Sequence, residues 1–232
     1  MKLPFEEVWL LNLVERSDRL DKMRKQFDHL GWRDQVQEVK AVIHPFCGII
    51  QQCFNQLKVG FLNSPNAFSC TREHYTLIKS AYLRGINSIC IIEDDVSFHK
   101  SLELWEDYLC SIPSDWDILR LCSLRGRPEE EKFEKVPNLK WSSVFSGMWG
   151  TGCYALSRKG MEYMMKEVES FYQPIDLPLF NYQKNPAIKH YIPNTPLGLC
   201  LEDSLQSNIN QTSASNLYFK DLKNIKIEDY KI

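Results

Sequence analysis

Short apolar runs alternate with amphipathic stretches along this chain, a pattern typical of β-α-β units. Residues 8–13 form a nearly continuous apolar run, which predicts a strand buried on both faces of a parallel sheet. From residue 17 to residue 30 the apolar positions recur at helical spacing. Ser17 or Asp18 can cap that helix, and Gly31 can end it. The chain therefore opens with a strand, a polar turn and a helix.

The same alternation continues through most of the sequence and predicts an α/β domain. Strands are expected at residues 36–42, 88–92, 116–122, 141–145, 153–156 and 197–201, and helices at residues 49–57, 69–84, 102–109 and 157–168. Residues 125–140 are charged and contain proline, so they are expected to form a surface loop. Met161, Met164 and Met165 keep helical spacing and are expected to pack in the core.

Length and composition limit the possible classes of protein. With 232 residues, 44% of them hydrophobic and 25% charged, the chain is expected to fold as one globular domain, residues 1–232. The formal net charge of −2 and the absence of a basic stripe argue against a nucleic-acid partner. No apolar run approaches the roughly 20 residues that span a bilayer. Since residues 1–13 also lack the features of a secretory signal, the expected location is cytoplasmic, with peripheral contact to a membrane surface left open.

The eight cysteines are scattered and include no C-x-x-C pair. This spacing argues against a zinc ribbon or a thioredoxin-like site. Several of the cysteines lie inside apolar runs, so buried, reduced thiols in a reducing compartment are expected.

Three adjacent carboxylates, Glu93, Asp94 and Asp95, follow the apolar run at residues 88–92. Ligands of open α/β sheets bind beyond the carboxyl ends of the strands, where this cluster is expected to lie. Adjacent carboxylates repel one another, and a divalent cation with a preference for oxygen ligands, Mn²⁺ or Mg²⁺, would relieve that repulsion. In an extended strand Glu93 and Asp95 point to one side, as a D-x-D-like metal pair, and Asp94 points to the other, where it can meet another part of the ligand. The alternative is a solvated acidic turn.

Several segments, taken in order, resemble glycosyltransferase family 25, which includes lipopolysaccharide, lipooligosaccharide and collagen galactosyltransferases. The similar segments are Asn12-Leu13 with Arg16 and Arg19 (N-L-x-x-R-x-x-R), residues 69–74 (G-C-x-x-S-H), residues 91–96 around E-D-D, residues 115–119, and residues 152–160 (which contain Y-x-L-S-x-x-G) followed by residues 174–176. The chain departs from this pattern at Ser69, where the family has Gly, and at Glu73, where it has Ser.

The resemblance implies a GT-A-like fold, that is, a Rossmann-like mixed sheet flanked by helices. It also implies a UDP-sugar donor, most often UDP-galactose, and an inverting displacement. Residues 1–125 would then bind the nucleotide sugar and the metal, and residues 126–232 would bind the acceptor. The expected acceptor is a glycan, a lipid-linked glycan or a glycoprotein, as in lipopolysaccharide biosynthesis.

Candidate donor-binding residues come from these segments. They are Asn12, Leu13, Arg16, Arg19, His74 and Asp94. Arginine suits bidentate contact with a pyrophosphate, although Arg16 and Arg19 can equally be solvated charges at a helix start. His74 is a candidate through the resemblance, whereas a single helical histidine is more often a structural hydrogen-bonding group.

An inverting transfer needs a base that takes the proton of the acceptor hydroxyl, and a carboxylate is the usual group. Asp176 is the first candidate; Glu202 and Asp203 come next, and one of these two can instead complete the metal shell. Each can also be a surface carboxylate or a helix cap. His190 is a further candidate metal ligand, and Trp141 and Trp149 can either stack on an acceptor sugar or fill the core.

The sequence therefore predicts a metal-dependent hexosyltransferase. Two alternatives stay open. One is a catalytically silent glycosyltransferase-like binding module, suggested by Ser69 and Glu73. The other is a metal-dependent phosphohydrolase that uses the same carboxylates.

Overall fold

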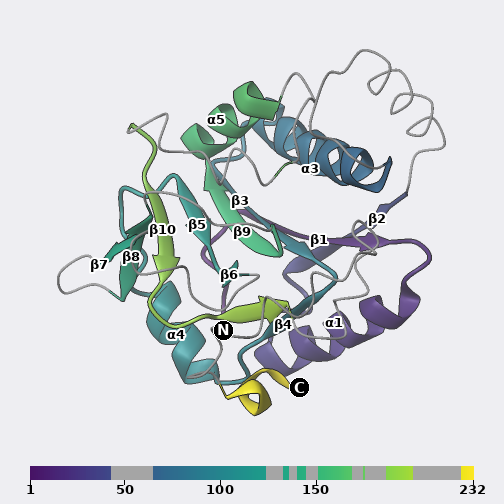
Figure 1. Ribbon diagram of the computed structural model, residues 1–232, viewed down its shortest axis with the longest axis vertical. Coiled ribbons are helices and arrows are strands. Elements are labelled where there is room, and N and C mark those ends of the chain that lie inside the picture. The colour runs from purple at the N-terminus through teal and green to yellow at the C-terminus, as the bar shows by residue number, and fades with distance from the viewer. Residues whose placement is uncertain are drawn as a thin grey trace.

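An eight-stranded mixed sheet with strand order β2-β1-β3-β9-β5-β10-β8-β7 forms the centre of the fold (Figure 1). The computed structural model describes residues 1–42, 65–123, 133–135, 140–144, 151–168, 175, 187–200 and 226–232. The strands of the sheet are β1 (Glu7–Leu13), β2 (Val36–Ala41), β3 (Ser88–Glu93), β5 (Ile118–Arg120), β7 (Phe133–Lys135), β8 (Trp141–Val144), β9 (Cys153–Ser157) and β10 (His190–Pro193). This architecture confirms the expected α/β class with a Rossmann-like mixed sheet flanked by helices.

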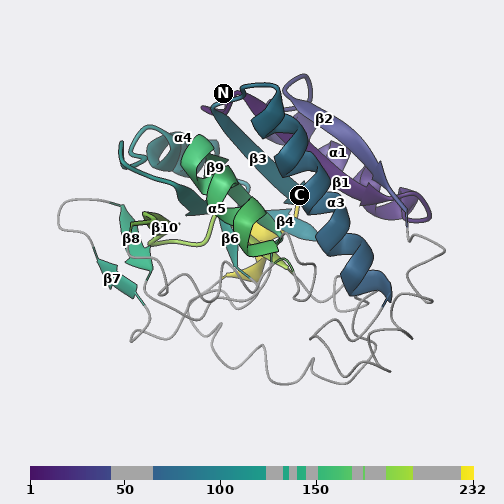
Figure 2. The ribbon, with the colours of Figure 1, turned by 90° about the horizontal axis from the view of Figure 1, so that it is seen from above.

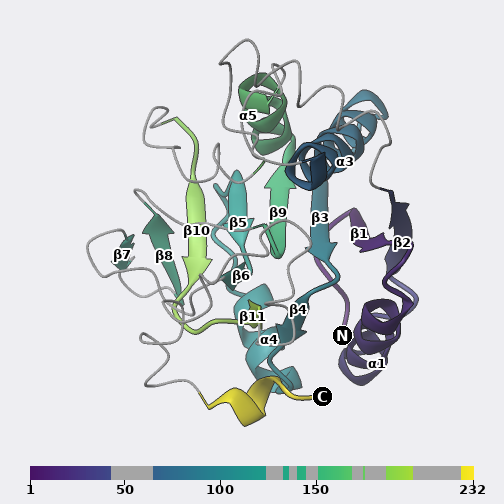
Figure 3. The ribbon, with the colours of Figure 1, turned by 45° about the vertical axis from the view of Figure 1, so that its right-hand side comes forward.

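A second, three-stranded sheet lies next to the end of β3. It has the order β4-β11-β6 and consists of β4 (Val96–Phe98), β11 (Gly198–Cys200) and β6 (Cys122–Ser123). Figure 3 shows β3 running toward β4, so the acidic cluster connects the two sheets. The strand expected over residues 116–122 is in fact two short strands, because the chain passes from the large sheet to the small one at Leu121.

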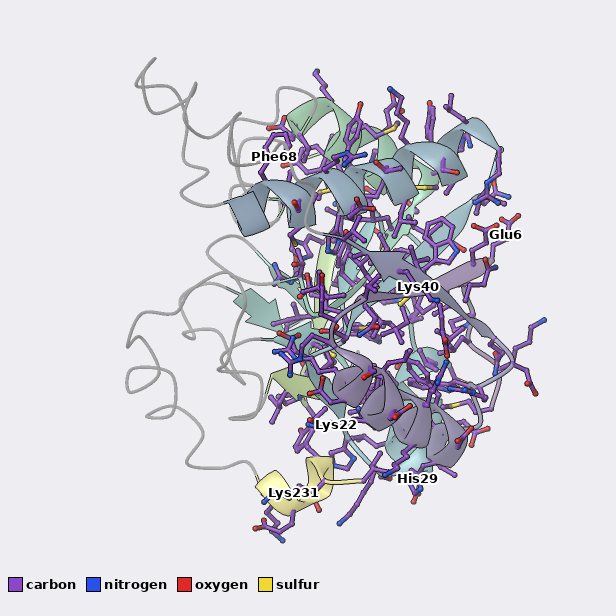
Figure 4. The ribbon with its side chains drawn as sticks, turned by 90° about the vertical axis from the view of Figure 1, so that its right-hand side faces the viewer. Glu6, Lys22, His29, Lys40, Phe68 and Lys231 are labelled. Carbon is purple, nitrogen blue, oxygen red and sulfur yellow. The ribbon has the colours of Figure 1, made fainter. Side chains whose placement is uncertain are left out.

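Helices cover both faces of the large sheet. They are α1 (Ser17–Leu30), α3 (Pro65–Leu83), α4 (Leu102–Leu109) and α5 (Arg158–Val168), and a 3-10 helix, η5 (Ile227–Tyr230), lies near the C-terminus. Figure 2 shows α3 and α5 in front of the strands, with α1 and α4 behind them. Figure 4 shows the same separation from the side, with Phe68 of α3 and Lys22 of α1 on opposite sides of the sheet.

Two hydrophobic cores result from this arrangement, and consecutive residues of β3 alternate between them. Cys90 and Ile92 pack toward α1 and α4, whereas Ile89 and Ile91 pack toward α3 and α5. This alternation follows from the two-residue period of a strand and explains why β3 is apolar throughout. Met161 and Met164 are fully buried in the second core, which confirms their expected packing role.

The helix boundaries mostly agree with the sequence patterns. Gly31 ends α1 in the left-handed conformation, with φ of 68°. The Ser157 hydroxyl caps α5 by accepting the N–H of Gly160 at 3.1 Å. The expected cap of α1 is wrong: neither Ser17 nor Asp18 caps it, because Arg16 occupies the cap position and no side chain there accepts a helix N–H.

Two other expectations concern segments that the structure describes in part or not at all. The stretch expected as a surface loop, residues 125–140, contains β7, which pairs with β8 at the edge of the sheet. A charged edge strand lacks the apolar alternation of a buried one, which is why the sequence pattern missed it. The helix expected over residues 49–57 lies outside the described residues.

Gly160 lies where α5 crosses the end of β5, and it leaves no room for a side chain. A Cβ at this position would lie 2.1 Å from the backbone carbonyl oxygen of Asp117. Gly160→Ala is therefore expected to lower the free energy of unfolding by about 1–3 kcal/mol, even though alanine favours helix. Urea denaturation measures this change. Glu162→Ala, at an exposed position of the same helix, is the matched control, and equal stability of the two variants would contradict the prediction.

Candidate active site

The site lies at the carboxyl end of β3, beside the carboxyl end of β1. The two strands are parallel neighbours, and Leu11 is the partner of Glu93. The loop after β1 therefore faces the carboxylates that follow β3. Strand alternation directs Glu93 and Asp94 to different elements: Glu93 contacts α3, and Asp94 contacts the β1–α1 connection.

Asp94 is buried and holds the β1–α1 connection in place. Its Oδ2 accepts the side-chain amide of Asn12 at 2.7 Å and the backbone N–H of Leu13 at 3.2 Å, and its Oδ1 pairs with Arg19 at 2.9 Å. Asn12 also donates to the carbonyl of Arg16 at 3.1 Å. Asp94 is thus engaged with its neighbours, whereas the sequence suggested that it would be available to a ligand.

The two candidate arginines of this connection differ in their surroundings. Arg19 is buried with Asp94, whereas Arg16 is partly exposed and makes a two-pronged contact with Asp18 at 2.9 and 2.8 Å. The hydrogen bonds from Arg16 lower the pKa of Asp18 to about 2. Arg16 is therefore the arginine of the pair that can turn toward a ligand, by exchanging an exposed carboxylate for a phosphate.

Glu93 is contacted by a residue of α3 and by a residue just before β9. His74 Nε2 lies 3.1 Å from Glu93 Oε1, and the Thr151 hydroxyl donates to the same oxygen. The other ring nitrogen of His74 contacts the hydroxyl of Tyr154 at 2.8 Å. Burial by itself would raise the pKa of Glu93, but the contacts with His74 and Thr151 and the charge of Arg120 lower it. Glu93 is accordingly stabilised as an anion.

Asp95 has the opposite electrostatic environment. Burial and the neighbouring negative charge of Glu93 raise the pKa of Asp95 to about 7, and Arg19 only partly offsets them. A carboxylate pair of this kind binds a proton or a divalent cation in preference to holding two bare charges. The donor set of Glu93 and Asp95 offers hard oxygen ligands and therefore fits Mn²⁺ or Mg²⁺.

The three candidate bases, Asp176, Glu202 and Asp203, lie outside the described residues. Their neighbours in sequence are described. The N–H of Ile175 donates to the Thr71 hydroxyl of α3 at 3.1 Å, one position before Asp176. Cys200 of β11 pairs with Val96, the residue that follows Asp95.

Two of the remaining candidate residues, Trp141 and His190, are buried in the interior of the fold. Trp141 is fully buried, and its indole N–H donates to Ser111 at 3.3 Å, so it fills the core and does not stack on a sugar. His190 is buried beside Arg120, and burial and that positive charge lower its pKa well below the usual range. Its full burial within β10 assigns His190 to the interior of the sheet. Trp149 lies outside the described residues.

Thr151 and Tyr154 were missed by the sequence analysis. Tyr154 belongs to the segment that resembles the family pattern, but it has no role that the pattern itself indicates. Both residues become part of the site because β9 runs antiparallel beside β3, with Ile91 opposite Tyr154. Cross-strand neighbours of this kind are set by sheet topology, which the sequence pattern does not contain.

The family model of glycosyltransferase family 25, described as an LPS biosynthesis protein family, matches residues 5–179, three quarters of the chain, which include Glu93, Asp94, Asp95 and the contacts described for them. The chain belongs to glycosyltransferase family 25. The predicted family is thereby confirmed.

Curated relatives in this family share about a quarter of their residues with the chain. Procollagen galactosyltransferase 1 of Danio rerio is 26% identical over 219 residues, which cover 84% of this chain and 34% of the relative. Procollagen galactosyltransferase 2 of Mus musculus is 26% identical, and the matched segment covers 82% of this chain and 32% of the relative. Inactive glycosyltransferase 25 family member 3 of Mus musculus is also 26% identical, and the matched segment covers 71% of this chain and 29% of the relative. The chain therefore spans about a third of the length of these relatives.

Solved structures with some similarity share 10% of their residues with the chain. Mannose-1-phosphate geranyltransferase from Thermus thermophilus has a TM-score of 0.40 and covers 84% of this chain and 74% of its own. Mouse xyloside xylosyltransferase 1 has a TM-score of 0.37 and covers 80% of this chain and 84% of its own. Within the described residues, no helix has the length and apolar character required to cross a bilayer.

Proposed function

We propose that this family 25 protein transfers a hexose, galactose in the first instance, from a UDP-sugar to a hydroxyl group of a glycan or glycoconjugate. The observation that carries the proposal is the pair Glu93 and Asp95 at the carboxyl end of β3, where Asp95 has a pKa raised to about 7. The names of the procollagen galactosyltransferases support galactose as the sugar.

Glu93 and Asp95 would bind Mn²⁺ or Mg²⁺ together with the donor diphosphate. The bound ion supplies positive charge that neutralises the diphosphate as it leaves. The Thr151 hydroxyl donates a hydrogen bond to Glu93 Oε1, which keeps that oxygen in a defined position, and His74 Nε2 lies 3.1 Å from the same oxygen. We therefore propose that His74 acts on the donor through Glu93, since its own side chain is fully buried.

The β1–α1 connection is the proposed nucleotide-sugar contact within residues 1–125. Asn12, Leu13 and Arg19 would shape this connection through Asp94, and Arg16 would reach the pyrophosphate. The Asp94 cluster would thus hold the backbone in a fixed shape before the donor arrives. Such preorganisation reduces the entropy lost on binding.

Residues 126–232 are proposed to bind the acceptor and supply the base. The base removes the proton of the acceptor hydroxyl while the acceptor oxygen forms a bond to the anomeric carbon. The bond between that carbon and the diphosphate oxygen breaks at the same time, and its electron pair leaves with the diphosphate. Attack from the opposite side inverts the anomeric centre. Asp176 is the first candidate, supported by the attachment of Ile175 to Thr71 of α3. Glu202 and Asp203 follow Cys200 in the sequence, the last residue of β11, which pairs with Val96. Either can act as base or complete the metal shell.

A catalytically silent module is the second candidate function. Relatives from mouse and cattle carry the word inactive in their names, and this chain has Ser69 and Glu73 where the family pattern has Gly and Ser. Such a protein would still bind the nucleotide and the cation without transferring a sugar.

Nucleotide binding tests both candidates at once. UDP with Mn²⁺ at about 100 times the dissociation constant is expected to raise the free energy of unfolding by roughly 2.7 kcal/mol. Thermal and urea denaturation measure this effect, and a purine nucleotide with Mn²⁺ is the control. Stabilisation together with UDP release from a UDP-sugar supports the transferase. Stabilisation without turnover on a broad acceptor panel supports the silent module. Absence of stabilisation contradicts both proposals.

The acceptor class and the cellular location remain predictions. A glycan, a lipid-linked glycan of the lipopolysaccharide type and a glycoprotein each offer the hydroxyl that this chemistry needs. A cytoplasmic location, with contact to a membrane surface, would suit a lipid-linked acceptor. Transfer assays with each acceptor type would distinguish them.

A further inference from the structure

A second set of possible metal ligands meets at Glu93, on the side that faces α3. Cys70 and His74 lie one helical turn apart on α3, so their side chains project from the same face of the helix. One ligand atom from each of Cys70, His74 and Glu93 lies within 4.8 Å of the other two. These three residues differ in chemistry from the oxygen pair of Glu93 and Asp95, because two of them offer sulfur and nitrogen.

The orientation of the His74 ring is that of a metal ligand. The ring is fully buried, and among the described residues its Nε2 has no partner in hydrogen-bonding geometry, although Glu93 Oε1 is 3.1 Å away. Its Nδ1 contacts the Tyr154 hydroxyl at 2.8 Å. Histidine ligands of metal ions usually have one nitrogen on the ion and the other fixed by a hydrogen bond, as here. A buried Nε2 without a hydrogen-bond partner in the described part of the chain, 3.1 Å from Glu93 Oε1, is therefore available to an ion held among these three side chains.

We propose that Cys70, His74 and Glu93 form a site for a zinc-class divalent cation, with a fourth position open to water. Thiolate and imidazole ligands select zinc-like ions over Mn²⁺ or Mg²⁺, which prefer oxygen. In tetrahedral zinc sites with bonds of about 2.0–2.3 Å the ligand atoms stand about 3.3–3.8 Å apart. In this structure the ligand atoms lie within 4.8 Å of one another, and His74 Nε2 is 3.1 Å from Glu93 Oε1. Small rotations of the side chains would therefore bring the ligand atoms to the distances of a zinc site.

Binding at this site has defined chemical consequences. The Cys70 thiol loses its proton as its sulfur bonds to the ion, so binding strengthens as the pH rises. Glu93 Oε1, the oxygen nearest to His74, becomes a ligand of the new ion. The inference concerns binding alone and does not depend on the proposed sugar transfer.

Cobalt substitution tests the proposal directly. The 232-residue protein, treated with chelator and then titrated with Co²⁺, is expected to show thiolate-to-cobalt charge-transfer absorption together with the visible bands of tetrahedral cobalt. Zn²⁺ added in equal amount is expected to abolish both. Cys70→Ser is expected to remove the charge-transfer band and to weaken Zn²⁺ binding at least about tenfold. Cys110→Ser, which changes an exposed thiol at the end of α4, is the matched control and should leave the spectrum unchanged.

A measurement on the unmodified chain covers the case in which Cys70→Ser fails to fold. Zn²⁺ is expected to protect Cys70, but not Cys110, from alkylation by iodoacetamide, as read by mass spectrometry of the two peptides. Equal labelling of Cys70 with and without Zn²⁺, or a charge-transfer band that persists in Cys70→Ser, would overturn the proposal.

The test separates this inference from the proposed function. Asp95→Asn should keep the cobalt spectrum, because Asp95 is not one of the three ligands. Loss of stabilisation by UDP and Mn²⁺ with an intact cobalt spectrum would contradict the transferase proposal alone. A missing cobalt spectrum with normal UDP and Mn²⁺ binding would contradict the zinc-class site alone.

Discussion

Replacing Asp95 with asparagine is expected to lower Mn²⁺-supported sugar transfer by about 10²–10³-fold, the effect of removing one group that stabilises charge in a transition state. The substitution keeps the size of the side chain and removes the negative charge that would hold the ion beside Glu93. Initial rates of UDP release from a UDP-sugar over a range of Mn²⁺ concentrations measure the loss. Turnover equal to that of the parent protein would remove the basis of the proposed function.

Two comparisons separate a lost cation from a damaged fold. Asp21→Asn changes an exposed aspartate on α1 and should leave transfer unchanged. In the presence of a chelator and above pH 7, Asp95→Asn should resist urea at least as well as the parent protein. Burial and Glu93 raise the pKa of Asp95 to about 7, so the ionised Asp95 side chain destabilises the metal-free parent protein above that pH. A variant that is both inactive and unstable under these conditions would indicate misfolding instead.

Asp94→Ala is expected to lower the free energy of unfolding by about 3–5 kcal/mol, the usual cost of removing one member of a buried ion pair. The change leaves the Arg19 guanidinium buried without its carboxylate, and it leaves the Asn12 amide and the Leu13 N–H without their acceptor. Urea denaturation, with amide exchange at Leu13 as a local probe, measures both effects.

The matched control for Asp94 is Asp18, an exposed aspartate at the start of α1 that pairs with the partly exposed Arg16. Asp18→Ala should change stability little, because solvent screens that pair. A double variant, Arg19→Met with Asp94→Asn, should recover part of the stability lost in Asp94→Ala, because no unpaired charge remains buried. If Asp94→Ala and Asp18→Ala had equal effects, Asp94 would have no organising role.

The three adjacent acids therefore have different roles, which their environments assign. Asp94 joins the β1–α1 connection to β3 through Asn12 and Arg19. Glu93 is kept ionised by His74 and Thr151, and Asp95 has a raised pKa beside it. One structural carboxylate and a pair that favours a cation thus arise from a single acidic run.

Sequence patterns were reliable where one local rule sufficed. The helix over Ser17–Leu30 and its end at Gly31, the strand Ser88–Glu93 and the cap at Ser157 each depend on spacing or on a single side chain. The patterns failed at β7, a charged strand at the edge of the sheet, and at the start of α1, where Arg16 occupies the cap position. The ordered motifs correctly indicated the family.

The sequence by itself determined the α/β class, the family and the position of three carboxylates at the end of a buried strand, because periodicity and motif order are properties of the linear chain. Only the tertiary structure decided that Asp94 meets Asn12 and Arg19, and that Glu93 meets Thr151. These three partners lie 82, 75 and 58 residues along the chain from the carboxylates they contact, and the order of strands in the sheet brings them together. Charge, pKa and metal preference depend on such neighbours, so the chemistry of the acidic run was settled by packing and not by the run itself.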